Sequence, residues 1–170
     1  MIIIGIDTAI RKTGYGVIDM RTGGSIRILD CGLIRNASSL PHSDCLRRLA
    51  GGSRELVSSF KPEAAAIESA FVSRNVRTAM ILSLARGAVI TALAECSVPA
   101  FEYSPKSAKR AATGLGEADK SQVAAIMANL GGLDISQIPD DATDALALAY
   151  CHGNLVLRAG SGIVKQPQPI

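Results

Sequence analysis

The sequence has 170 residues, of which 48% are hydrophobic and 19% are charged. This length suits one domain with one core, and this balance excludes an intrinsically disordered chain. A net charge of +3 neither requires nor excludes a nucleic-acid partner, so the placement of the charges has to decide. The four cysteines show no Cys-x-x-Cys spacing, which indicates free thiols in a reducing compartment. We find no signal-peptide pattern and no apolar run of about 18 residues, so we expect a soluble, cytoplasmic protein without a membrane partner.

The N-terminal segment is expected to form three consecutive strands. Residues 2–6 hold four isoleucines and no charge, which is typical of a strand buried on both faces. That strand ends in Asp7, at the end where open α/β sheets collect ligands and catalytic groups. Two further strands are predicted over 14–19 and 26–34, and residues 21–24 indicate a hairpin between them. The short turns predict an antiparallel meander.

The next segment predicts a helix followed by a short strand. Residues 43–60 carry apolar side chains at helical spacing on one face. Gly51 and Gly52 lie inside this helix, which indicates either a kink or a close approach of another backbone. Residues 64–67 then predict a short buried strand that ends in a second acid, Glu68.

The most apolar helix is predicted over residues 75–95 and is apolar nearly all round, so we expect it to be buried on more than one side. A homodimer interface and a central position in the core both explain this pattern. A strand over 98–103 follows, so two strands flank a helix as in a parallel βαβ unit. The fold class predicted is α/β, with a mixed five-stranded sheet flanked by helices.

The C-terminal part is expected to be helical and then to become irregular. Ser104-Pro105 has the residue types of a helix start, with serine as N-cap and proline at the first helical position. Further helices are predicted over 119–130 and 140–152. We therefore expect one folded domain over residues 1–153 and a flexible tail over 154–170.

Four acids are predicted to converge at one end of the sheet. Asp7 and Glu68 each end a strand, and the two strands would lie about 4.8 Å apart if they are parallel neighbours. Asp141 and Asp144 are three residues apart and so share a face of the last helix. The apolar side of that helix would dock on the sheet and aim both acids at the strand ends.

Such a cluster of carboxylates requires cations, because like charges raise one another's pKa. No His or Cys stands at ligand spacing nearby, and hard oxygen ligands suit Mg²⁺ or Mn²⁺. Two such ions would activate water and stabilise the leaving oxygen in phosphodiester hydrolysis. For any single acid near the start of the last helix, the alternative is a favourable interaction with the helix dipole. We assign that role to Asp140, as an exposed cap.

Basic and polar residues flank this acidic site along the chain. The first group contains Arg74, Asn75, Arg77 and Arg86, and the second contains Lys106, Lys109 and Arg110, with Lys120 at the start of the next helix. Solvated surface is the ordinary explanation of such charges, but two groups around one acidic metal site favour a polyanionic substrate. Phe71 lies in a predicted loop after Glu68, either as an inward-packed anchor or as a stacking platform for an unpaired base.

A set of short motifs occurs in a fixed order from residue 2 to residue 152. They are Gly5-Ile6-Asp7, Thr13-Gly14-Tyr15-Gly16, Ala66-Ile67-Glu68, Phe71-Val72-Ser73-Arg74-Asn75, Ala85-Arg86-Gly87, Phe101-Glu102-Tyr103, Lys120-Ser121-Gln122-Val123 and Asp141-Ala142-Thr143-Asp144-Ala145-Leu146-Ala147. This ordered set resembles the bacterial RuvC Holliday-junction resolvase family. The chain departs from the family at Thr8-Ala9, where the family usually has Pro-Gly, so this loop is expected to differ.

The resemblance implies a ribonuclease H-like fold, a homodimer, and paired incisions across a four-way DNA junction. It implies that the four acids are the metal ligands, and that Lys109 and Lys120 are functional lysines. It also implies a junction-contacting aromatic at Phe71, a phosphate contact at Arg74, and cooperation with the RuvA–RuvB branch-migration complex.

The hypothesis is a Mg²⁺-dependent, structure-selective endonuclease of recombination and repair. It would cut the backbone by in-line attack of water, leaving a 5′-phosphate and a 3′-hydroxyl. One alternative is a junction-binding protein with impaired catalysis. Another is an actin-type or sugar-kinase-type ATPase domain, which shares a strand followed by Gly-Ile-Asp and Thr-Gly but needs two such domains.

Overall fold

The structure is a computed structural model that describes residues 1–69, 75–132, 134, 138–162 and 164–170. In these residues the chain forms one five-stranded sheet with strand order β3-β2-β1-β4-β5. The strands are β1 Ile2–Asp7, β2 Lys12–Met20, β3 Ile26–Arg35, β4 Ala64–Glu68 and β5 Ala100–Tyr103. The first three strands pair antiparallel, and β1–β4 and β4–β5 pair parallel. The predicted mixed sheet, with its meander and its parallel pairs, is confirmed.

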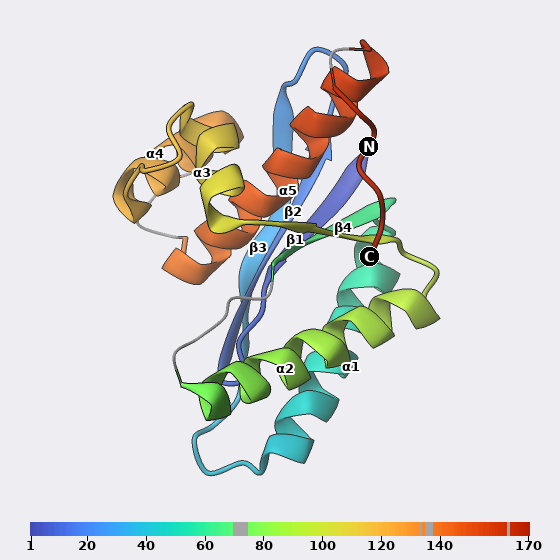
Figure 1. Cartoon of the computed structure of the whole chain (residues 1–170), viewed down its shortest axis with the longest axis vertical. Helices are drawn as coiled ribbons and strands as arrows, with labels where there is room; N and C mark the ends of the chain where they lie inside the picture. The colour runs from blue at the N-terminus through green and yellow to red at the C-terminus, as the bar shows by residue number, and fades with distance from the viewer. Residues whose placement is uncertain (70–74, 133, 135–137, 163) are drawn as a thin grey trace.

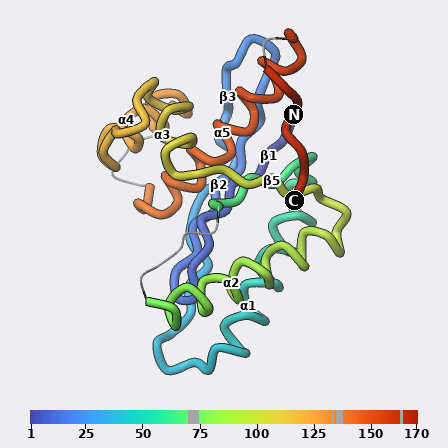
Figure 2. The backbone as a smooth tube through the Cα atoms, in the orientation of Figure 1, coloured from blue at the N-terminus to red at the C-terminus, as the bar shows by residue number. Residues whose placement is uncertain are grey.

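Helices cover both faces of the sheet. They are α1 His42–Phe60, α2 Val76–Glu95, α3 Pro105–Thr113, α4 Lys120–Gly131 and α5 Asp140–Gly160. Figure 1 shows α1 and α2 together on one side of the sheet, and α3, α4 and α5 on the other side. The tube of Figure 2 shows the same division.

The isoleucines of β1 divide the core between the two faces. Ile4 and Ile6 belong to the cluster that packs with residues of α1 and α2, such as Leu49 and Val89. Ile3 points to the other face and packs in the cluster formed with α4 and α5. All three isoleucines are buried, so β1 is a central strand covered on both faces, as its apolar run predicts.

The two glycines inside α1 do not mark a kink, because α1 runs unbroken from His42 to Phe60, and packing explains Gly52 alone. A Cβ atom at Gly52 would lie 2.9 Å from the Cδ1 atom of Ile34 in β3, whereas one at Gly51 would meet nothing within 4 Å. Gly52 therefore permits a close contact between α1 and the sheet.

The last helix is longer than the sequence analysis predicts. α5 continues to Gly160, eight residues beyond the expected end at residue 152. The expected boundary at residue 153 thus falls inside a helix, and that expectation was wrong. Leu155 and Leu157 pack against the core cluster of this face, which explains why the helix continues. At the chain end, the Ile170 amide donates a hydrogen bond to the carbonyl of Ala100 at 2.9 Å, beside β5.

The apolar helix α2 is buried on one side only. Ala85, Val89, Ala92 and Leu93 are buried, whereas Val76, Met80 and Leu84 are 70%, 63% and 52% exposed. Within the described residues, α2 is the single helix long and apolar enough to cross a membrane, by length and composition alone. It packs on α1 and carries Arg86, which is ion-paired with Glu102, in its middle. A charged pair in the middle of a helix is costly inside a bilayer. Contact with another apolar protein surface is therefore a better explanation of the exposed apolar side of α2 than insertion into a membrane.

Candidate active site

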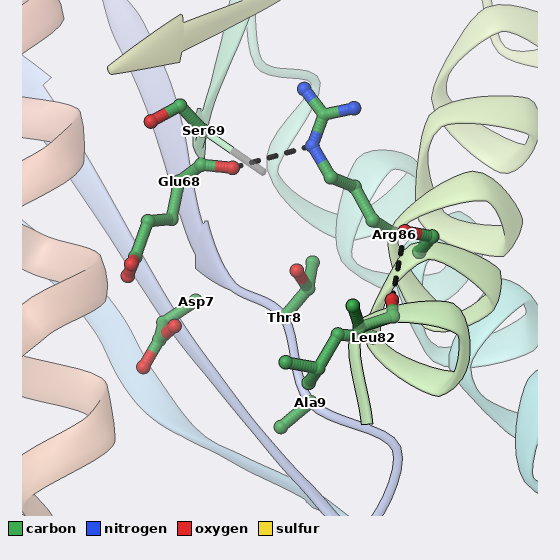
Figure 3. A pocket seen from close by; sticks show the side chains of 9 residues that line it. Asp7, Thr8, Ala9, Glu68, Ser69, Leu82 and Arg86 are labelled. Carbon is green, nitrogen blue, oxygen red and sulfur yellow. Dashed lines mark hydrogen bonds between the residues drawn. The ribbon is translucent and has the colours of Figure 1, made fainter. Parts of the chain in front are cut away.

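Two carboxylates stand side by side at the ends of parallel neighbouring strands. Ile6 of β1 is paired with Ile67 of β4, which places the next residues, Asp7 and Glu68, next to each other. Figure 3 shows both side chains directed to the same side of the sheet, toward α5. This adjacency follows the rule that ligands gather at the carboxyl ends of parallel strands.

The proximity of the two acids changes their protonation. Burial, followed by repulsion from Glu68 and Asp144, raises the pKa of Asp7 to about 7. The pKa of Glu68 is also raised, mainly by burial, although its hydrogen bond with Asp7 lowers it in part. Near neutral pH, Asp7 is therefore close to half protonated, which reduces the repulsion among the crowded acids.

Helix α5 brings two further acids to the same place because small residues let it lie directly on the sheet. A Cβ atom at Gly5 would lie 1.8 Å from the carbonyl oxygen of Ala145, and one at Gly14 would lie 2.0 Å from that of Asp141. Gly14 is also the register partner of Asp7. As a result, ligand oxygens of Asp7, Asp141 and Asp144 all lie within 4.8 Å of one another.

Three lysines balance the charge of these acids. The Nζ atom of Lys120, at the start of α4, donates to the Oδ2 atom of Asp144 at 2.7 Å, and this bond raises the pKa of the lysine. Lys109 of α3 and Lys120 both line a cavity of about 250 Å³ together with Asp7, Glu68 and Asp144. The sequence analysis selected both lysines through the family resemblance.

The third lysine was missed. Lys12, at the start of β2, places its Nζ atom 2.7 Å from the Oδ2 atom of Asp141. The residue lies outside the strand predicted over 14–19, yet β2 begins at Lys12 and pairs with β1 from Gly14 opposite Asp7. Lys12 therefore lies just beyond the end of β1 that carries Asp7. The pairing register of the hairpin formed by β1 and β2 would have predicted this position.

Arg86 of α2 was also missed as a site residue. Its Nε atom donates to the backbone carbonyl of Glu68 at 3.3 Å, and its guanidinium pairs with Glu102 of β5. Figure 3 shows Arg86 reaching from α2 toward this carbonyl, beside a second cavity. That cavity has a volume of about 260 Å³ and is lined by Asp7, Thr8, Ala9 and Glu68, among others. Arg86 thus ties the ends of β4 and β5 to α2, which fixes the backbone that carries Glu68.

Two of the remaining predicted site residues, Asn75 and Lys106, do not lie at the carboxylates. Phe71 and Arg74 lie outside the described residues. Asn75 is the N-cap of α2, where its Oδ1 atom accepts from the amide of Thr78 at 3.2 Å. Lys106 forms an ion pair with Glu117 at 2.6 Å and lines a different cavity from the one that holds Lys109.

The loop after Asp7 accommodates its unusual residues without strain. Thr13 closes the loop, since its hydroxyl donates to the carbonyl of Ala9 and accepts from the amide of Ala9 at 3.1 Å. Among the described non-glycine residues, positive φ angles occur at Lys61 and Ser97, and not at Ala9. A glycine is therefore not required at this position.

The carboxylates fit the divalent metal that the resemblance implies. The donor atoms are hard oxygens from β1, β4 and α5, and a cation among them would offset the repulsion that, after burial, raises the pKa of Asp7. A mixed five-stranded sheet with acids at the ends of β1 and β4 and on the crossing helix defines a ribonuclease H-like nuclease.

Comparisons with known proteins identify the family. The family model described as "Crossover junction endodeoxyribonuclease RuvC" matches residues 3–152. A relative of that name from Chlorobaculum parvum is 46% identical over 151 residues, covering 89% of this chain and 80% of the relative. Another, from Chloroflexus aggregans, is 38% identical over 149 residues, covering 88% of this chain and 90% of the relative. The chain belongs to the RuvC family of crossover junction endodeoxyribonucleases.

A solved structure agrees with this assignment over the whole fold. The RuvC of T. thermophilus, described in complex with Holliday junction substrate, matches with a TM-score of 0.88 and 30% identity, covering 100% of this chain and 99% of that chain. The ribonuclease H-like fold is thereby confirmed, and the ATPase alternative is set aside by the family assignment.

Proposed function

We propose that the chain is a metal-dependent endonuclease that resolves four-way DNA junctions by paired phosphodiester hydrolysis in homologous recombination and repair. The observation that carries the proposal is the convergence of Asp7, Asp141 and Asp144, with Glu68 beside Asp7, in a chain of the RuvC family. A structure of a relative in complex with Holliday junction substrate supports the choice of DNA.

Asp7, Glu68, Asp141 and Asp144 would hold the metal, as two Mg²⁺ ions per subunit or Mn²⁺ in their place. The ions supply activation of the attacking water and stabilisation of the leaving oxygen. Asp141 and Asp144 are paired with Lys12 and Lys120, respectively. Both lysine side chains are exposed, so a metal ion would displace them from the two carboxylates at little cost.

Lys109 and Lys120 act on the substrate. Both project into the cavity that contains Asp7 and Glu68, so their ammonium groups face the position of a phosphate held at the carboxylates. There they stabilise the additional negative charge that develops on the phosphate oxygens. Arg86 is a positioning residue, because it bonds to the backbone of Glu68 and to Glu102.

Phe71, Arg74, Asn75 and Lys106 complete the DNA-binding proposal. Phe71 and Arg74 precede α2 by a few residues, on the path between Glu68 and that helix. We assign an aromatic contact with the junction to Phe71 and phosphate contacts to Arg74, Asn75 and Lys106. For Asn75, the contact comes in addition to its role as a helix cap.

We place a homodimer interface on α2. Val76, Met80 and Leu84 are spaced by four residues and therefore form one exposed apolar stripe along the helix. Gly87 and Thr91 continue the same stripe with small exposed residues, which allow close approach of a second helix. A second copy of the chain offers the same stripe, so the contact closes with two-fold symmetry and gives two active sites for two incisions.

Two cellular features belong to the same proposal. We infer cooperation with a RuvA–RuvB branch-migration complex, since it supplies the junction that the nuclease cuts. We infer a cytoplasmic location, which suits the four cysteines because all of them are free thiols.

The test is a gel assay with a fixed four-way junction and a linear duplex of the same sequence, with and without Mg²⁺. The expected result is a pair of symmetric nicks in the junction, dependent on metal, and no cut in the duplex. Asp7→Asn is expected to abolish the nicks and to retain junction binding. Tight binding without cutting under any divalent metal would instead support the alternative of a junction-binding protein.

A further inference from the structure

A cationic cavity lies on the side of α3 that faces away from the carboxylates. Its volume is about 590 Å³, compared with about 250 Å³ for the cavity that holds Lys109 and Lys120. Lys106 and Arg110 of α3 form one wall, and Tyr150, Asn154 and Arg158 of α5 form the other. Because Lys109 lines the first cavity and Lys106 and Arg110 line the second, α3 separates two basic surfaces.

The charge of this cavity has one sign. Three cations line it, and none of the described residues along its walls is acidic. Glu117, which pairs with Lys106, is exposed and lies outside this wall. Within the described part of the chain, neither Arg110 nor Arg158 takes part in an ion pair. Arg110 is near enough to Glu117 to help lower the pKa of that carboxyl, but neither arginine is bound directly to an acid among the described residues, so both guanidinium groups can bind phosphate groups.

The remaining lining suits a nucleic-acid strand rather than a small anion. Ser107 and Asn154 supply neutral hydrogen-bond donors, and Tyr150 and Leu155 supply a half-buried apolar surface. A sugar–phosphate backbone presents phosphate oxygens and apolar sugar faces in alternation, so it uses both kinds of surface. An isolated phosphate ion would use the guanidinium groups and the neutral donors, but not the apolar surface.

The cavity lies further along α5 than the carboxylate site, because its lining residues from α5 all follow Asp144 in the helix. Tyr150 and Arg158 follow Asp144 by six and fourteen residues. At a rise of about 1.5 Å per residue, the cavity therefore extends from about 9 to about 21 Å along the helix axis from Asp144. Phosphates of one DNA strand are spaced by about 3.4 Å along the duplex axis, so this span corresponds to about three to six phosphates from the one being cut.

We propose that the cavity between α3 and the second half of α5 is a phosphate-binding subsite for the junction arm that leaves the active site, with Arg110 and Arg158 as its anchoring residues. This inference rests on the proposed function for its substrate. It adds a part of the binding surface that is separate from the carboxylates.

The experiment compares two double variants in the full-length protein. Arg110→Ala/Arg158→Ala removes the two guanidinium groups of the subsite. Arg47→Ala/Arg54→Ala removes two exposed arginines from α1, on the opposite face of the sheet, and is the matched control for net charge. Binding of a labelled four-way junction is measured without divalent metal, so that the DNA stays intact, over a series of salt concentrations.

The subsite variant is expected to bind the junction about tenfold more weakly or worse, and its salt dependence is expected to lose a slope of about 1.8, which corresponds to two phosphate contacts. The control is expected to retain the affinity and slope of the unmodified protein. Neutral methylphosphonates placed three to six positions from the cut site should weaken binding by the unmodified protein and leave binding by the subsite variant unchanged.

Equal affinity and slope for the subsite variant and the unmodified protein would overturn the inference, as would an equal loss in the control. These results leave the proposed function standing as long as the unmodified protein cuts the junction. Failure of the unmodified protein to cut any junction in Mg²⁺ would overturn the proposed function itself, so the two failures are distinguishable.

Discussion

The carboxyl groups of Asp7 and Glu68 share a proton in a hydrogen bond at the ends of two parallel strands, and burial, followed by repulsion from Glu68, raises the pKa of Asp7 to about 7. Without a bound metal ion, this proton neutralises one of the neighbouring carboxylates. A divalent metal has to displace it, because a protonated carboxyl is a poor ligand. Metal binding and the protonation of Asp7 are therefore linked.

Metal affinity is accordingly expected to rise with pH, by up to about tenfold per pH unit below the pKa of Asp7, and to level off above about pH 7. Titration calorimetry with Mn²⁺ in two buffers of different ionisation enthalpy measures the released proton directly. In Asp7→Asn, the affinity should be lower and nearly independent of pH over the same range. A pH-independent affinity in the unmodified protein would contradict the assignment of this proton.

Replacement of Lys12, the partner of Asp141, and of Lys120, the partner of Asp144, is expected to affect DNA cleavage to different extents. Lys12 neutralises Asp141, and Lys120 neutralises Asp144 while also lining the catalytic cavity. Replacement of either lysine by methionine removes a cation that competes with metal, so metal affinity should rise about twofold to fivefold. Junction cleavage at saturating Mg²⁺ should fall by about a hundredfold or more in Lys120→Met and by less than about tenfold in Lys12→Met. Equal losses of cleavage would show that neither lysine has a specific role toward the substrate.

Much of this site could be predicted from local sequence. An acid directly after a buried strand, found at both Asp7 and Glu68, indicates the carboxyl end of a sheet. The partners of Asp141 and Asp144 could not be predicted in the same way, since they depend on where α5 lies on the sheet. That position follows from the close backbone contacts at Gly5 and Gly14.

The extent of two helices was harder to predict for a similar reason. The sequence of α5 beyond residue 152 contains leucines among polar residues, and these become helical because they pack on the core. In α2, an apolar composition all round does not distinguish core from interface. The structure exposes one stripe of α2, so a central position in the core does not explain that stripe, whereas the proposed interface does.

The α2 stripe gives a prediction on oligomeric state. Leu84→Glu places a charge in the middle of the proposed interface and should convert a dimer into a monomer in light-scattering measurements after size exclusion. The monomer should give single nicks in place of paired incisions. Leu115→Glu is the control, because Leu115 is 66% exposed and lies outside α2. If Leu84→Glu remains a dimer, the interface must lie on another surface of the protein.

The buried His152 gives a prediction on acid stability. Its Nδ1 atom lies 2.7 Å from the hydroxyl of Tyr103, and burial lowers the pKa of His152 to about 4. The unfolded chain takes up a proton near pH 6.5 whereas the folded chain does not, so this residue's contribution to stability falls as the pH drops from about 6.5 to about 4. The loss reaches about 3 kcal/mol at the lower limit.

Asp7 acts in the opposite direction over the same range. Its pKa is raised on folding, so the folded chain retains a proton that the unfolded chain has lost, and metal-free stability falls as the pH rises toward about 7. The histidine effect must therefore be measured as a difference. Urea unfolding of the unmodified protein and of His152→Gln, at a series of pH values, should give free-energy differences that shrink as the pH falls. A constant difference would show that His152 takes up its proton at the same pH in the folded and the unfolded chain.

The last prediction concerns the contact that places α5 on the sheet. In Gly5→Ala, the new methyl group would lie 1.8 Å from the carbonyl oxygen of Ala145, so strand and helix must separate. We expect a loss of about 3 kcal/mol or more in the free energy of unfolding, because backbone on both sides cannot give way as a side chain does. The variant should also bind Mn²⁺ more weakly, since Asp144 moves with the helix.

Gly51→Ala is the matched control for Gly5→Ala. It makes the same chemical change in α1, where the new methyl group meets nothing within 4 Å. In the interior of a helix this change should raise the free energy of unfolding by up to about 1 kcal/mol and leave Mn²⁺ binding unchanged. If Gly5→Ala retains both its stability and its Mn²⁺ affinity, the close contact between Gly5 and Ala145 does not position Asp141 and Asp144. The geometry of the carboxylates would then have to be set by the lysine pairs alone.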